Sequence, residues 1–64
     1  MEGTIRANIK IGGEVMVVQK LDQRTGKLTK GLVKRILTNS HIHHRGIKVM
    51  LTTGIVGRVQ QIVK

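Results

Sequence analysis

Lysine and arginine side chains are the residues of this sequence whose types and spacing suggest chemistry, and that chemistry is the binding of phosphates. The chain has 64 residues with twelve Lys and Arg against three Asp and Glu, a formal net charge of +9 at pH 7. Cations that neutralise phosphates release condensed counterions, which gives an affinity that needs no particular base sequence. The composition therefore predicts a polyanionic partner, with charge that only maintains solubility as the alternative.

The first predicted hairpin carries a dense group of cations. Four of them lie within one strand–turn–strand unit: Lys20, Arg24, Lys27 and Lys30. Several of these side chains can project from the same end of a small barrel toward one phosphate backbone. We predict that the binding surface also takes in cations from the later strands and loop: Lys34, Arg45, Lys48 and Arg58.

Three of these contacts depend on the local backbone. In a regular strand Lys34 and Arg35 point to opposite faces, and parity places Lys34 on the face of Lys30, unless a bulge resets the alternation. Lys48 extends this stripe if its strand pairs with that of Lys34. Arg58 follows a glycine, and it is equally suited to hold the closing turn through backbone carbonyls.

A histidine-rich loop offers the only metal-like cluster in the sequence. His41 and His43 fall on one side of an extended segment, close enough together for a Zn²⁺, Ni²⁺ or Cu²⁺ ion. A closed structural zinc site needs about four ligands, and the chain has no cysteine and no well-placed carboxylate here. We therefore predict no metal and no cofactor, and a loop that contacts RNA or water.

Composition also bears on the class of function. Three scattered carboxylates and the lack of a serine–histidine–acid arrangement predict that the chain is not an enzyme. Phe, Tyr and Trp are absent, so base stacking, worth about 1–3 kcal/mol per base, is not available. We predict a small basic module that contacts structured RNA through phosphates, in a ribosome- or translation-associated ribonucleoprotein with a protein partner. The alternative is an SH3-like protein-interaction module that binds an acidic or extended peptide.

Short β-branched runs closed by glycines predict the strands that position these cations. The expected segments are Glu14 to Leu21, Lys27 to Thr38, Ile47 to Thr52 and Ile55 to Val59, with Gln60 to Lys64 as a helical turn or a short closing strand. Asp22 to Gly26 is typical of a hairpin loop. Gly31 is the expected place for a bulge or a sharp bend. The alternation of Ile47, Val49 and Leu51 predicts that these three face the core.

A chain this short is expected to form one domain over residues 1–64. Four to five short strands cannot build two sandwich layers, so we predict a bent sheet closed on itself: an all-β, SH3-like barrel of about five strands, or alternatively an OB-like barrel. Ile5, Ile9 and Ile11 are candidates to cap one open end of the barrel. The lack of cysteine, of a signal peptide and of any apolar run near 20 residues predicts a cytoplasmic monomer without membrane contact.

Two resemblances accompany these patterns. The segment from Gly13 to Val15, followed by a charged hairpin and Gly31 to Leu37, is similar to KOW and related SH3-like barrels of ribosomal and transcription proteins. From Ile9 onward the chain more closely resembles the YwbE-like family of small uncharacterised proteins, on the motifs DQRTGKLT at Asp22 to Thr29 and GRVQ at Gly57 to Gln60. This second resemblance implies the domain type and adds little about function.

Overall fold

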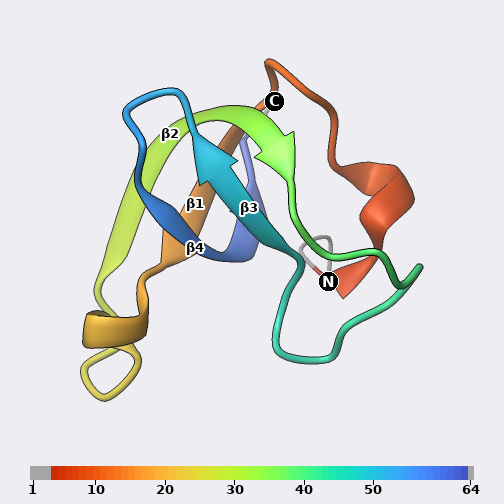
Figure 1. Ribbon diagram of the computed structural model, residues 1–64. Helices are drawn as coiled ribbons and strands as arrows, with labels where there is room; N and C mark the ends of the chain where they lie inside the picture. Colours follow the sequence, from red (N-terminus) through yellow and green to blue (C-terminus); the bar gives the residue numbers. More distant parts are fainter. Residues whose placement is uncertain (1–3, 64) are drawn as a thin grey trace.

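The computed structural model describes residues 4–63, and over this range the chain folds as a small closed β-barrel (Figure 1). Its elements in chain order are η2 (Arg6–Asn8), β1 (Glu14–Val18), η3 (Lys20–Asp22), β2 (Leu28–Ile36), β3 (Lys48–Leu51) and β4 (Val56–Ile62), where η denotes a 3-10 helix. All strand pairs are antiparallel, and β4 pairs with β1 to close the sheet. The predicted all-β barrel is confirmed, with an architecture consistent with a small SH3-like or OB-like barrel. None of the helices described is long and apolar enough to cross a membrane.

The length of β4 explains why four strands close the barrel within the described residues, where about five were expected. β4 continues to Ile62, so the residues after Val59 extend it instead of forming a separate closing element. Gln60 is an extra residue in its pairing with β1, because the register shifts there. Such a bulge bends a strand, and the bend allows a single strand to follow the curve of the barrel.

β2 changes its pairing partner halfway along its length. Residues 28–32 pair with β1 and residues 33–36 pair with β3. The change follows directly after Gly31, where the sequence predicts a bulge or a bend. No bulge lies at Gly31 itself, because the pairing of β2 with β1 is regular through this residue and the bulge lies at Lys34. β2 as a whole is strongly curved (Figure 1).

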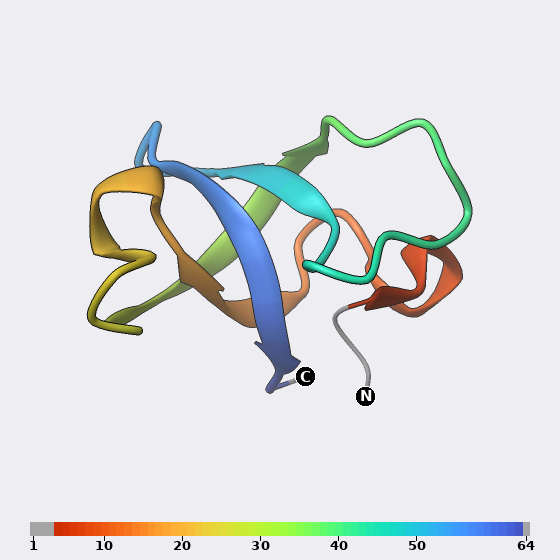
Figure 2. The ribbon, with the colours of Figure 1, turned by 90° about the horizontal axis from the view of Figure 1, so that it is seen from below.

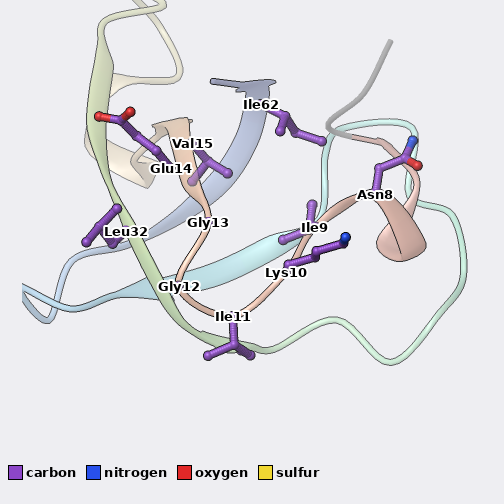
Figure 3. Close-up of a pocket in the computed structure, with 10 residues that line it drawn as sticks. All are labelled: Asn8, Ile9, Lys10, Ile11, Gly12, Gly13, Glu14, Val15, Leu32 and Ile62. Carbon is purple, nitrogen blue, oxygen red and sulfur yellow. The ribbon is translucent and has the colours of Figure 1, made fainter. Parts of the chain in front are cut away.

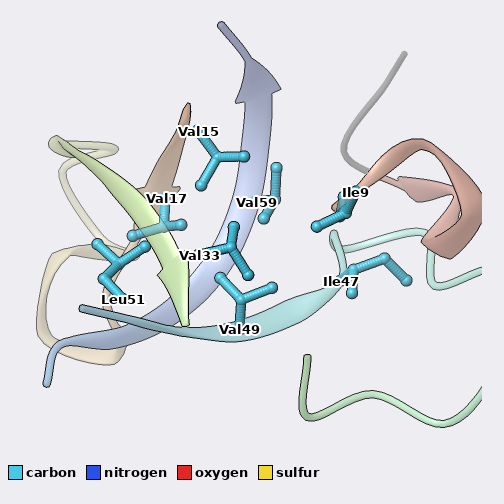
Figure 4. Close-up of a cluster of buried hydrophobic side chains, with 8 residues drawn as sticks. All are labelled: Ile9, Val15, Val17, Val33, Ile47, Val49, Leu51 and Val59. Carbon is cyan, nitrogen blue, oxygen red and sulfur yellow. The ribbon is translucent and has the colours of Figure 1, made fainter. Parts of the chain in front are cut away.

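Eight aliphatic side chains fill the barrel (Figure 4). They are Ile9, Val15, Val17, Val33, Ile47, Val49, Leu51 and Val59. Ile47, Val49 and Leu51 are each 0% exposed, which confirms the inward face predicted from their alternation. Burial of this apolar surface is the main favourable term in folding, at about 25 cal/mol per Å² removed from water.

The two ends of the barrel are closed differently. Figure 2 shows η2 and the loop between β2 and β3 side by side at one end, with the first hairpin turn at the other. The backbone N–H of Arg6 donates to the carbonyl oxygen of His41 at 2.8 Å and ties η2 to that loop. Ile9 is 4% exposed and caps this end as predicted, whereas Ile5 and Ile11 are 40% and 62% exposed and do not.

Candidate nucleic-acid interface

A groove with four cations lies on the outer surface of the barrel, over β1, β3 and β4. It has a volume of about 430 Å³ and is lined by Val18, Lys20, Gln23, Arg45, Lys48, Val56, Gly57 and Arg58. No acidic residue of the described part of the chain is among these lining residues. We call this feature the basic groove, and its electrostatic character favours an anionic ligand.

Strand register places two of these cations directly opposite each other. Lys48 of β3 is the cross-strand partner of Arg58 of β4, and Arg58 is also paired with Val18 of β1. Side chains opposite each other in antiparallel strands have Cβ atoms about 4.5–5.5 Å apart, and like charges at such positions are destabilising. An anion bound between the two side chains would offset this repulsion.

Arg58 is anchored by the loop that precedes β3. Its Nη1 atom donates a hydrogen bond to the carbonyl oxygen of Gly46 at 3.1 Å, in a partly buried position. The bond to a backbone carbonyl that the sequence suggested is therefore present, although the acceptor lies in this loop and not in the closing turn. A guanidinium has five N–H donors, so one such bond leaves donors for a ligand in the basic groove.

Lys20 owes its place to a change of structure at the end of β1. The strand was expected to continue to Leu21, but it ends at Val18, and η3 begins at Lys20. The loop that follows is closed by the N–H of Gly26, which donates to the carbonyl oxygen of Asp22 at 2.7 Å. Gly26 has a φ of 75°, a left-handed conformation that glycine adopts without strain.

Arg45 comes from the loop at the other end of the barrel. The side-chain amide of Gln60 on β4 donates to the carbonyl oxygen of Arg45 at 3.1 Å. The N–H of Gly46 donates to the carbonyl oxygen of His43 at 2.8 Å. The first bond joins the loop to β4 and the second closes a turn within the loop, and Arg45 of this loop lines the basic groove.

The remaining predicted cations lie outside the lining of the basic groove. Arg24 and Lys27 are exposed on the hairpin turn, close in sequence to the groove residue Gln23. Lys30 is on β2, with its Nζ atom 3.8 Å from Oε2 of Glu14. An exposed pair of this kind contributes about 0–1 kcal/mol. The hairpin cations therefore do not form a single patch: Lys20 lines the basic groove, while Lys30 lies beside Glu14 on the β1–β2 side.

The bulge at Lys34 settles the parity question on β2. Arg35 is paired with Met50, which lies on the outer side of β3, and both Lys34 and Arg35 are exposed. The bulge therefore resets the alternation of faces, so that Lys34 and Arg35 are both exposed, which was expected from the sequence only if a bulge occurred. No feature of the sequence around Lys34 predicts the position of this bulge.

A second hollow adjoins the basic groove and was missed from the sequence. It has a volume of about 690 Å³ and is lined by Val18, Gln23, Gly26, Leu28, Arg45, Gln60 and Gln61. We call it the glutamine hollow. The Gln60–Gln61 doublet is the signal in the sequence that could have pointed to this hollow.

A third hollow, shown in Figure 3, is largely apolar. It has a volume of about 590 Å³, and its lining combines residues 8–15 with Leu32 and Ile62. Its two charged lining residues, Lys10 and Glu14, have opposite signs. This hollow therefore lacks the cationic character of the basic groove.

The histidine loop is organised by local contacts. The backbone N–H of Arg45 donates to Nδ1 of His43 at 3.2 Å, and the rings of His43 and His44 stack with centroids 5.5 Å apart. Within the described residues there is no group of three or more potential metal ligands among His, Cys, Asp and Glu. His41 and His43, the weak metal candidates of the sequence, therefore have no third ligand beside them in this part of the chain.

His43 is expected to titrate below its ordinary range. Desolvation lowers its pKa from 6.5, and the positive charges of Arg58, His44 and Arg45 lower it further. The unfolded chain then binds this proton more readily than the folded protein, so acidification through pH 6.5 reduces stability. NMR titration of the His43 ring should give a midpoint below 6.5 that rises in an Arg58→Gln variant. A midpoint at or above 6.5 would show that Arg58 is not close to this ring.

Comparisons with known proteins agree with one another. A family model described as "Uncharacterized conserved protein (DUF2196)" matches residues 2–62. The "Uncharacterized protein YwbE" of Bacillus subtilis (strain 168) is 56% identical over 63 residues, which covers 98% of this chain and 97% of that protein. No solved structure matches the chain significantly.

Proposed function

We propose that this chain, which belongs to the DUF2196 family of uncharacterized conserved proteins with its YwbE-like members, binds structured RNA through phosphate contacts in the basic groove. Membership confirms the resemblance carried by the motifs at residues 22–29 and 57–60. The likeness to KOW domains stays a prediction. Because the family description names no ligand, the proposal depends on the geometry of the groove.

The observation that carries the proposal is the convergence of four cations on one groove whose described lining includes no carboxylate. Lys20, Arg45, Lys48 and Arg58 come from four separate parts of the chain and line the same space. Hydrogen bonds from ionised donors to phosphate are roughly twice as strong as neutral ones, and arginine can bind a phosphate through two parallel bonds. A phosphate backbone is the ligand that uses these donors best.

Two features favour this function over its alternatives. Charge that served solubility alone would not need Lys48 and Arg58 directly opposite each other, an arrangement that opposes folding. A peptide that binds by strand addition needs an exposed sheet edge, and each of the four described strands is paired on both sides in the closed barrel. The proposal therefore stands ahead of solubility alone and of peptide binding by strand addition.

Aromatic side chains on which bases could stack are absent. The proposed recognition therefore depends on the shape and the phosphates of folded RNA, which need no particular base sequence. The proposal also states that the protein acts in the cytoplasm in association with the ribosome or with translation, that it binds RNA as a monomer, and that it catalyses no reaction. Arg24 and Lys27 are exposed on the hairpin turn, close in sequence to the groove residue Gln23, and would supply longer-range attraction to the same ligand.

Salt dependence of RNA binding tests the proposal. Affinity of the protein for an RNA hairpin, measured by fluorescence anisotropy, should fall with a slope of about −3 in log K against log salt, as four phosphate contacts require. A Lys20→Gln/Lys48→Gln variant should reduce this slope by about 2, since each lysine–phosphate contact contributes about 1. Its affinity at low salt should fall at least tenfold.

The matched control is a Lys10→Gln/Lys34→Gln variant, which removes the same charge from exposed positions outside the basic groove. It should keep most of the affinity and the slope of the natural protein. Equal losses in the two variants would mean that the charge acts diffusely and not through the groove. Absence of RNA binding at low salt would overturn the proposed function.

A further inference from the structure

We infer that the basic groove and the glutamine hollow form one continuous site for an RNA nucleotide that is unpaired beside a helix. The phosphates lie in the basic groove and the base lies in the glutamine hollow. This inference rests on the proposed function and adds to it the kind of RNA that is recognised. It predicts a preference for bulges, loops or ends over uninterrupted duplex.

The two hollows are joined by a shared wall. Val18, Gln23 and Arg45 line both of them. A single row of outward residues also crosses all four strands at this place. In order across the sheet, the row is Leu28, Val18, Arg58 and Lys48.

This row changes character along its length. Leu28 and Val18, at the end that lines the glutamine hollow, are aliphatic, and Arg58 and Lys48, at the end that lines the basic groove, are cationic. Neighbouring strands lie about 4.7–4.9 Å apart, so the change occurs within one strand spacing. A nucleotide has the same division, because its base is uncharged and its phosphate is anionic.

Three of the seven residues that line the glutamine hollow are glutamines, which are uncharged and form hydrogen bonds. Its lining includes the side-chain amides of Gln23, Gln60 and Gln61, and each amide offers both donors and an acceptor. The amide nitrogen of Gln60 donates to the carbonyl oxygen of Arg45 at 3.1 Å, which orients this side chain. Among the described residues, no hydrogen bond involves the side chains of Gln23 and Gln61. Their amides are therefore available to the edge of a base.

The aliphatic pair can take the place of the aromatic platform that the chain lacks. Val18 and Leu28 are partly exposed on the wall of the hollow. Unstacked bases are held between apolar as well as aromatic side chains, with hydrogen bonds to their Watson–Crick edge. Bases within an A-form duplex do not present this edge, and the major groove is too deep and narrow for side chains to enter. The hollow therefore fits a base that has left the helix.

The experiment compares two RNA duplexes of about 16 base pairs, the length that spans two minor grooves. One carries a single bulged nucleotide, and in the other the same nucleotide is paired by an added complement. The paired RNA carries one phosphate more, so charge alone favours it. The natural protein should nevertheless bind the bulged RNA about tenfold more tightly.

A Gln61→Ala variant, which changes a residue that lines the glutamine hollow but not the basic groove, should lose most of this preference and keep its affinity for the paired duplex within about twofold. The Gln61 side chain is exposed and makes no hydrogen bond within the described structure, so the variant is expected to fold, as thermal unfolding will verify. The Lys20→Gln/Lys48→Gln variant should instead lose affinity for both RNAs.

The outcomes separate the two proposals. Equal binding of both RNAs by the natural protein would overturn the inference and leave phosphate binding in place. A preference that survives in the glutamine variant would also overturn it, because the base would then be recognised elsewhere. Binding of neither RNA would overturn the proposed function itself.

Discussion

Replacing Gly46 by alanine is expected to remove most of the folding free energy of this protein. Gly46 is buried and has a φ of 103°, where a residue with a side chain is strained by about 1–3 kcal/mol. A Cβ at this position would also collide with the carbonyl oxygen of Val59, and overpacking typically costs a further 1–3 kcal/mol or so. A 64-residue domain has roughly 3–10 kcal/mol in total, so the variant should be largely unfolded or close to it.

Urea denaturation of Gly46→Ala beside Gly54→Ala separates the two causes. Gly54 has a φ of 90°, but a Cβ added there would meet no atom within 4 Å, so its substitution shows the backbone strain alone. We expect Gly46→Ala to lose at least about 1 kcal/mol more than Gly54→Ala, the lower end of the cost of overpacking. Equal losses would mean that the loop moves away from Val59 without cost.

Gly46 also connects the core to the basic groove. Its carbonyl oxygen accepts the hydrogen bond from Arg58, and its neighbours in sequence are the groove residue Arg45 and the core residue Ile47. The N–H of Val59 donates to the carbonyl oxygen of Ile47 at 2.8 Å and holds this stretch against β4. If any Gly46→Ala protein folds, we expect its affinity for RNA to be reduced as well, because two of the four groove cations lose their support.

Local patterns allowed much of the fold to be predicted. The inward face of β3 follows from the alternation of Ile47, Val49 and Leu51, and the first hairpin turn follows from Gly26, because each pattern lies within a few residues of sequence. Strand ends were harder to predict. The 3-10 turn at η3 replaces the last residues expected in the first strand, and the residue types from Gln19 to Leu21 do not distinguish the two conformations.

The site was predicted less completely than the fold. All four groove cations were among the eight that the sequence proposed, but nothing in the sequence separates Lys48 from Lys30. The difference depends on long-range pairing: Lys48 faces Arg58 because of the register between β3 and β4, while Lys30 lies near Glu14 because of the register between β1 and β2. The glutamine hollow depends on the same pairing, so uncharged residues distant in sequence could not be grouped beforehand.

The effect of Gly31→Ala on the free energy of unfolding should change sign with the residue at position 51. Gly31 has no positive φ, so an alanine there would on its own stabilise by about 0.4–1 kcal/mol, because it restricts the unfolded chain. In the natural protein, however, the new Cβ would lie 2.7 Å from Cδ1 of Leu51. Leu51 is 0% exposed and has little room to move, so we expect a net loss of about 1–3 kcal/mol.

Removal of the Leu51 side chain should reverse this effect. Leu51→Ala alone should cost about 2–5 kcal/mol through the cavity that it leaves, and adding Gly31→Ala to it should then restore about 0.5–1 kcal/mol, because the colliding methyl group is gone. The measurement is a double-mutant cycle from urea denaturation, with Leu51→Val as the milder background if Leu51→Ala does not fold. Contacting residues give coupling free energies of about 0.5–3 kcal/mol in such cycles. Additive losses at the two positions would show that Gly31 is not required for the packing of Leu51, and that its place in the curved strand β2 has another cause.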